Sequence, residues 1–121
     1  VSLTMLEPEG DPLADWLESL ARLRAELPAD LLVLPAHGAP FTGLHTRLDA
    51  LIDGHHMQLD RLEERLREAP RRAVDCFGAM FARPIDDKLL GMATGETLAH
   101  LRWLERQGRA TMELRDGVAW W

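Results

Sequence analysis

The sequence predicts a mainly α-helical chain with one short strand and a C-terminal β-hairpin. Two segments have leucines at helical spacing, a continuous apolar run lies between them, and an alternating pattern surrounds an Asp-Gly pair near the C-terminus. The charge is also divided: residues up to Pro70 include 6 basic and 13 acidic side chains, and those beyond it include 8 and 7. We therefore place a domain boundary there and expect two parts, residues 1–70 and 71–121.

The first part begins with a helix that Asp11 and Pro12 are suited to open, because Asp caps free N–H groups and Pro has a helical φ angle. Its apolar stripe comprises Leu13, Trp16, Leu17, Leu20, Leu23 and Leu27. After this helix, the apolar run from Leu31 to Leu34 is typical of a strand buried on both faces of a parallel sheet. A single strand cannot form a sheet. We therefore expect its partners outside this chain, and we interpret the chain, which starts at Val1, as a fragment.

A long helix is expected from Leu44 to Glu68, where apolar residues recur at steps of three and four. Gly54 weakens this helix without ending it. The charged residues on its other face are expected to be solvated. On the preceding helix, Trp16, Leu17 and Leu20 would form a large apolar patch if left bare, so we expect the chain to self-associate.

The second part has the pattern of three short helices. The first spans residues 73–81 and the second runs from Asp86 or Asp87 to about residue 93. A turn at Thr94 and Gly95 then leads to the third helix, which ends at Gly108.

A β-hairpin follows, with alternating residues from 110 onward and a turn at Asp116 and Gly117. Three helices and a hairpin are the order of a winged helix-turn-helix, whose third helix can enter the major groove of DNA. The side chains expected to be exposed on that helix are Thr97, His100, Arg102, Glu105 and Arg106. Acidic residues offset these arginines, so we expect a packing, dimerisation or substrate-pocket role rather than DNA recognition. The tryptophans Trp103, Trp120 and Trp121 are candidates for the core of this part, or for an interface if exposed.

Composition limits the other function classes. The net charge of -6 argues against broad nucleic-acid binding, which needs clustered Lys and Arg. Cys76 is the single cysteine and has no disulfide partner within the chain, which favours a reducing, cytoplasmic setting. No apolar run has the length of a membrane span. Neither Cys76 nor any Ser has a convincing nucleophile–base arrangement, so catalytic residues stay unassigned.

His37 is the strongest candidate for chemistry. It follows the predicted buried strand directly, in a loop with Pro35 on one side and Gly38 on the other. Active sites of α/β layers gather at the carboxyl ends of strands, and glycine lets the backbone approach a ligand closely. A neutral imidazole there is suited to a divalent metal such as zinc. The alternative is a loop histidine that hydrogen-bonds the backbone.

Several segments resemble one family. The stretch from Leu32 to Pro40, which reads LVLPAHGAP, is similar to the terminal metal-ligand loop of the metallo-β-lactamase superfamily. The segments Pro8–Asp11 and Trp16–Leu20 resemble the hydrolase branch of that superfamily. The segment Gly95–Leu101, together with Gly108, resembles the winged-helix appendage at the C-terminus of some members. Ala36 stands where many relatives have glycine.

This resemblance implies the end of an αββα metallo-β-lactamase fold, namely a helix, one strand and a long helix, followed by the winged helix. It implies that His37 is the last histidine ligand of a site for two metal ions, usually zinc. The other ligands of the family, including its His-x-His-x-Asp-His motif, do not occur in this sequence. The implied activity is hydrolysis of an ester, thioester or phosphodiester by a metal-activated water, with a small molecule or RNA as substrate. The implied partner is the N-terminal β-rich domain, and the chain alone is expected to be inactive.

His55 and His56 form the second candidate. Neighbours on a helix point about 100° apart, so they are poorly placed to share a metal. His55 falls in the apolar seam of the long helix, and a structural role is favoured. In relatives this helix lies near the active-site mouth, so a substrate-pocket role for His56 stays open. The competing function for the whole chain is a non-enzymatic binding or dimerisation module with a winged helix, possibly one that binds nucleic acid.

Overall fold

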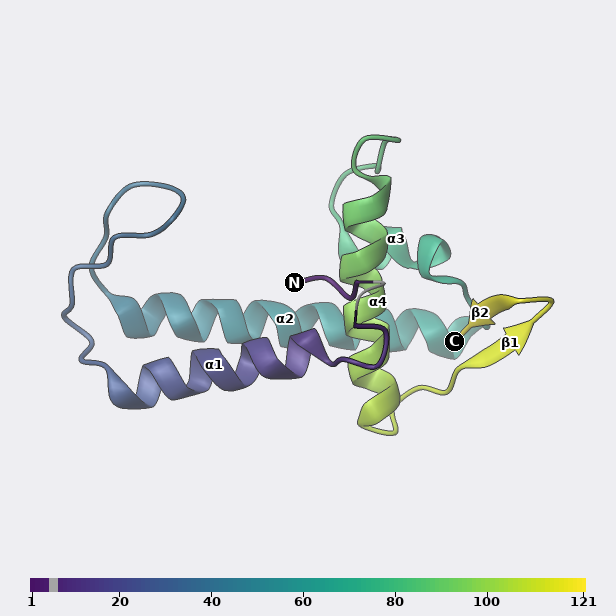
Figure 1. Cartoon of the computed structure of the whole chain (residues 1–121), viewed down its shortest axis with the longest axis horizontal. Helices are drawn as coiled ribbons and strands as arrows, with labels where there is room; N and C mark the ends of the chain where they lie inside the picture. The colour runs from purple at the N-terminus through teal and green to yellow at the C-terminus, as the bar shows by residue number, and fades with distance from the viewer. Residues whose placement is uncertain (5–6) are drawn as a thin grey trace.

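The computed structural model describes residues 1–4 and 7–121, and it is mainly helical (Figure 1). The long elements are α1 (Pro12–Glu26), α2 (Leu44–Glu68) and α4 (Leu90–Arg106). Two short elements connect α2 to α4, a 3-10 helix η1 (Ala73–Cys76) and α3 (Phe77–Met80), and the strands β1 (Glu113–Arg115) and β2 (Val118–Trp120) follow. Helices α1 and α2 lie side by side and antiparallel, and α4 crosses them near one end.

Helix α1 begins where the sequence predicts. The Asp11 carboxylate accepts a hydrogen bond from the Ala14 N–H at 3.1 Å, and Pro12 occupies the first turn. Leu13 and Leu20 are buried, and the helix packs along α2. Leu20 is only 1% exposed and Leu17 packs against the core, so of the three residues of the expected patch Trp16 stays exposed, at 38%; Leu23 of the same helix is 39% exposed.

The buried strand predicted at Leu31–Leu34 does not form within the described residues. Val33 and Phe41 make a single antiparallel bridge, with N–H to carbonyl distances of 2.8 and 3.1 Å. Leu32 and Leu34 on either side of Val33 are 65% and 75% exposed. No further strand of the described chain lies alongside to cover these side chains, and their burial by partners outside this chain stays a prediction.

Helix α2 confirms the predicted span from Leu44 to Glu68, with Gly54 inside it. Its buried side chains are Leu44, Leu48, Leu59 and Leu62. The first two form a small cluster with Leu20 of α1. The charged residues Asp60, Arg61, Glu64 and Arg65 are exposed, as predicted.

The turn predicted at Thr94 and Gly95 was wrong, because α4 runs through both residues as one helix. The Thr94 hydroxyl donates to the Leu90 carbonyl within the helix, at 2.7 Å. Gly95 is buried where the N-terminal segment crosses α4, and the Leu3 N–H donates to the Gly95 carbonyl at 2.9 Å. A Cβ at Gly95 would lie 2.7 Å from the Ser2 hydroxyl oxygen, so this glycine serves close packing instead of a turn.

The predicted second helix starting at Asp86 or Asp87 is also absent. The Asp86 carboxylate instead caps a turn, since it accepts from the N–H groups of Lys88 and Leu89, both at 3.1 Å. With one continuous helix in place of two, the winged helix-turn-helix is not confirmed. The hairpin is confirmed: Glu113 pairs with Trp120 and Arg115 with Val118. Asp116 and Gly117 adopt φ angles of 51° and 77°, the left-handed turn that an Asp-Gly pair favours.

One core joins residues from both sides of Pro70. Its buried members are Leu13, Leu59, Leu62, Ala73, Cys76, Met80, Leu101 and Leu104. Trp103 and Trp121 pack against it partly buried, and the guanidinium groups of Arg72 and Arg115 lie 5.6 and 5.4 Å from the centre of the Trp120 ring. Among the described residues, no helix combines the length and the apolar character needed to cross a bilayer.

Candidate functional site

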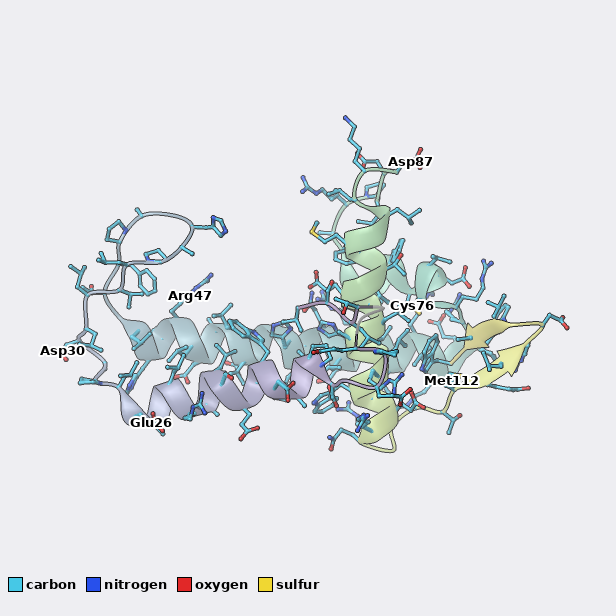
Figure 2. All side chains as sticks on the ribbon, viewed as in Figure 1. Glu26, Asp30, Arg47, Cys76, Asp87 and Met112 are labelled. Carbon is cyan, nitrogen blue, oxygen red and sulfur yellow. The ribbon has the colours of Figure 1, made fainter. Side chains whose placement is uncertain are left out.

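His37 lies exposed in the loop that connects α1 to α2. The Val33–Phe41 bridge closes the base of the loop, and Gly38 next to the histidine has a φ angle of 93°, which favours glycine. The loop lies at the outer end of the α1–α2 pair, at the opposite end of the molecule from the β-hairpin, and its tip turns back over the start of α2 (Figure 1). In Figure 2, Asp30 in the connection after α1 and Met112 just before β1 are labelled, and they lie at opposite ends of the molecule. His37 is therefore an exposed residue of a loop at one end of an elongated molecule.

The described residues contain no group of three His, Cys, Asp or Glu side chains placed to hold a metal ion. His37 supplies one imidazole, which suits one position in a zinc coordination shell of about four ligands. A two-zinc site does not fit the described residues by themselves. Whatever His37 contributes to a metal site depends on ligands from other residues.

His56 lies exposed on the surface of α2. Its ring approaches the Trp103 ring edge-on, with centroids 6.1 Å apart. The Arg109 guanidinium lies 5.8 Å from the same tryptophan ring and is ion-paired with Asp60 and Glu63 of α2. His56 thus belongs to a surface cluster that ties α2 to α4, and its substrate-pocket role stays a prediction.

His55 and His100 form a contact that the sequence did not predict. His100 was expected to be exposed with Thr97, but both are 0% exposed. The rings of His55 and His100 lie 5.3 Å apart between centroids, and His55 Nδ1 is 3.2 Å from His100 Nε2. The pattern of Ala93, Thr97 and His100 continues the helical stripe toward Leu104, so the spacing contained a signal of burial that their polarity obscured.

The hydrogen bonds of this pair fix the tautomers of both rings. His100 Nδ1 is 2.9 Å from the Glu96 carbonyl oxygen, and a carbonyl only accepts, so Nδ1 carries the hydrogen. Burial lowers the pKa of His100 to about 4, so its ring is neutral near pH 7 and its Nε2 is an acceptor. His55 Nδ1–H must then donate to it. Burial, then the N-terminal amino group and His56, lower the pKa of His55 as well, which leaves its Nε2 without a hydrogen.

Two grooves adjoin this pair. The first, of about 350 Å³, runs along α2 and is lined by Ala50, Leu51, Gly54, His55, Met57, Gln58 and Arg61. The second, also of about 350 Å³, lies between the α3 end and α4 and is mostly apolar. Its lining includes Met80, Phe81, Arg83, Met92 and Glu96. Only the first groove is lined by a member of this pair, the partly buried His55.

Cys76 is buried in the core, and burial raises the pKa of its thiol to about 11. A thiol with this pKa is protonated at neutral pH, and the thiolate is the reactive form. The structure therefore supports the sequence-based exclusion of Cys76 as a nucleophile.

The fold and the loop together define a helical module with one exposed histidine in the loop that joins α1 to α2. The family model for the metallo-beta-lactamase-like C-terminal domain matches residues 59–121, more than half of the chain. The chain belongs to this family, and the predicted membership of the metallo-β-lactamase superfamily is confirmed.

Two solved structures are similar over almost the whole chain. A beta-lactamase domain protein from Burkholderia ambifaria is 40% identical with a TM-score of 0.93, over 99% of this chain and 36% of its own length. A metallo-beta-lactamase family protein from Thermus thermophilus is 28% identical with a TM-score of 0.74, over 92% of this chain and 33% of its own length. The chain thus spans about a third of each relative. No curated protein matches it.

Proposed function

We propose that the chain is the C-terminal portion of a metal-dependent hydrolase and that His37 is one of the ligands of its two zinc ions. The observation that carries this proposal is the placement of His37, exposed beside Gly38 in a loop whose base is closed by a backbone bridge. The names of the two structural relatives support it, since both are described as beta-lactamase domain or family proteins. This portion is inactive by itself.

The exposed leucines just before His37 support the proposal that a partner domain packs against this loop. Leu32 and Leu34 each expose most of their side chains, and Val33 between them already has one strand-like pairing with Phe41. A β-rich N-terminal domain would cover these leucines and supply the remaining metal ligands. Burial of the exposed parts of these two leucine side chains contributes about 2–4 kcal/mol to such docking before the cost of association.

The residues of this chain would hold the metal and would not perform the chemistry alone. The zinc ions, when bound, would supply Lewis-acid chemistry and an activated water. The role of His37 would be to hold one imidazole ligand for a metal in this loop. The substrate class extends over esters, thioesters and phosphodiesters, in a small molecule or in RNA.

The alternative is a non-enzymatic binding or dimerisation module with a winged helix, including one that binds nucleic acid, and its nucleic-acid part has lost support. Thr97 and His100, expected on a recognition surface, are buried in the core of the described structure. No specific observation now favours that alternative.

The test is a His37→Ala variant of a longer protein that contains this chain. We expect loss of bound zinc in elemental analysis, and a fall in hydrolysis by more than about 100-fold, since even groups that only support a metal ligand contribute 10–100-fold. His45→Ala is the matched control, because this nearby histidine contacts the Leu27 carbonyl at 2.8 Å and is assigned no metal. Full zinc content and unchanged hydrolysis in His37→Ala would contradict the proposal. So would a longer sequence without the His-x-His-x-Asp-His motif.

A further inference from the structure

The groove along α2 contains an imidazole nitrogen with an unused lone pair. His55 Nδ1–H donates a hydrogen bond to His100 Nε2. His100 Nδ1–H donates in turn to the Glu96 carbonyl oxygen. The opposite nitrogen, His55 Nε2, makes no hydrogen bond with the described residues, and it is not among their buried unpartnered atoms. His55 lines the groove, so this nitrogen is an acceptor open to a ligand there.

The other polar groups of the groove define what that ligand needs. The Gln58 amide donates through Nε2 to the Met80 carbonyl at 3.3 Å, which leaves its oxygen as a second acceptor. Arg61 adds a positive charge and has no ion pair within the described part of the chain. Gly54 leaves open space between them, since a Cβ at this position would have nothing within 4 Å. The imidazole acceptor and the cation are complementary to an anion that has a hydrogen-bond donor of its own.

We propose that the groove lined by His55, Gln58 and Arg61 binds a small anion with an O–H group, such as a hydrogenphosphate or a phosphate monoester in its protonated form. The O–H donates to His55 Nε2, and the anionic oxygens accept from the Arg61 guanidinium. His100 is a positioning residue, because its Nε2 holds the hydrogen of His55 on Nδ1 and so keeps Nε2 free. His37 and His55 belong to different elements: His37 lies in the loop before α2, and about 16 Å of helix separates Leu44, the first residue of α2, from His55.

Hydrogenphosphate and sulfate provide a matched pair of probes. Slightly above neutral pH both are tetrahedral dianions of nearly equal size, but only hydrogenphosphate retains an O–H. Sulfate would place an acceptor oxygen against the lone pair of His55 Nε2. Because sulfate loses a hydrogen bond in which one partner is charged, we expect it to bind at least about tenfold more weakly than inorganic phosphate. The measurement is a titration followed through backbone amide resonances of α2 by nuclear magnetic resonance.

Two variants separate the roles of the residues. His55→Phe keeps an aromatic ring against His100 and removes both nitrogens, so phosphate and sulfate should bind equally weakly. Arg61→Ala should weaken phosphate binding about tenfold at low salt, because it removes the charge, while the preference over sulfate is retained. Arg22→Ala removes an exposed arginine of α1 outside the groove and should leave both titrations unchanged.

A third measurement needs no substitution, which matters if His55→Phe fails to fold. Nitrogen-15 spectra of the unmodified chain should show the hydrogen of both His55 and His100 on Nδ1, and phosphate should shift the Nε2 resonance of His55 alone. Equal affinity for phosphate and sulfate in the unmodified chain would overturn the proposal. So would a hydrogen on His55 Nε2, or phosphate-induced shifts that are confined to residues outside the groove.

Discussion

The outer loop and the crossing of α2 with α4 are both rich in leucine, yet they cover these side chains differently. At the crossing, Leu62 and Leu101 are 0% exposed. In the loop, Leu32 and Leu34 are 65% and 75% exposed. The difference shows that the crossing is part of the packed core, whereas the loop leaves its leucine side chains open. His37 lies in this loop, where the fold does not depend on burying Leu32 and Leu34.

The largest expected effect tests this division directly. Leu101→Ala should lower the free energy of unfolding by about 2–5 kcal/mol, because it removes a fully buried side chain and leaves a cavity. Leu34→Ala should change it by less than about 0.5 kcal/mol, since the side chain is mostly exposed. Urea unfolding of the 121-residue chain, followed by circular dichroism, measures both. A loss at Leu34 as large as that at Leu101 would show that the loop is part of the cooperative core in solution.

The sequence predicted correctly those elements that are determined by residues close to one another along the chain. Asp11 and Pro12 start α1, the spacing of leucines matches the span of α2, and the Asp-Gly pair forms the hairpin turn. In each case the determining residues lie within a few positions of one another. The sequence therefore sufficed for the two long helices of the first part and for the hairpin.

The misplaced elements depend on contacts between distant residues. Thr94 and Gly95 have a local turn signal, but the passage of Ser2 and Leu3 across α4 requires a small residue within a continuous helix. His100 was expected to be exposed because it is polar, and its partner His55 lies 45 positions away. The candidate site shows the same limit: the loop position of His37 follows from the sequence, whereas the tautomer-fixed pair does not.

The second prediction concerns how the free energy of unfolding depends on pH through His100, which is buried at the crossing of α2 and α4. The pKa of His100 is lowered from the ordinary 6.5 to about 4, so the folded chain takes up this proton only at lower pH than the unfolded chain does. The stability associated with a neutral His100 is complete above about pH 6.5 and is lost progressively as the pH falls toward 4. The loss should amount to about 3 kcal/mol across this window. Urea titrations at several pH values measure it.

His100→Leu is the control for that window. It removes the titrating group and keeps an apolar side chain in the core, at the cost of leaving the Glu96 carbonyl and His55 Nδ1–H without their partner. Its unfolding free energy should be lower at neutral pH but should vary much less between pH 6.5 and 4 than that of the unmodified chain. An equally steep pH dependence in this variant would place the titrating group elsewhere.

The smallest predicted effect compares two glycines of the same helix. Gly95→Ala should destabilise the chain by about 1–2 kcal/mol, because the new methyl group would lie 2.7 Å from the Ser2 hydroxyl oxygen and 3.2 Å from the Leu3 carbonyl oxygen. Gly91→Ala has nothing within 4 Å of the new methyl group, so it should stabilise the helix by about 0.5–1 kcal/mol. Thermal unfolding of both variants gives opposite shifts if the N-terminal segment stays on α4. Equal upward shifts would mean that this segment leaves α4 at little cost, so that residues 1–4 are not part of the packed crossing.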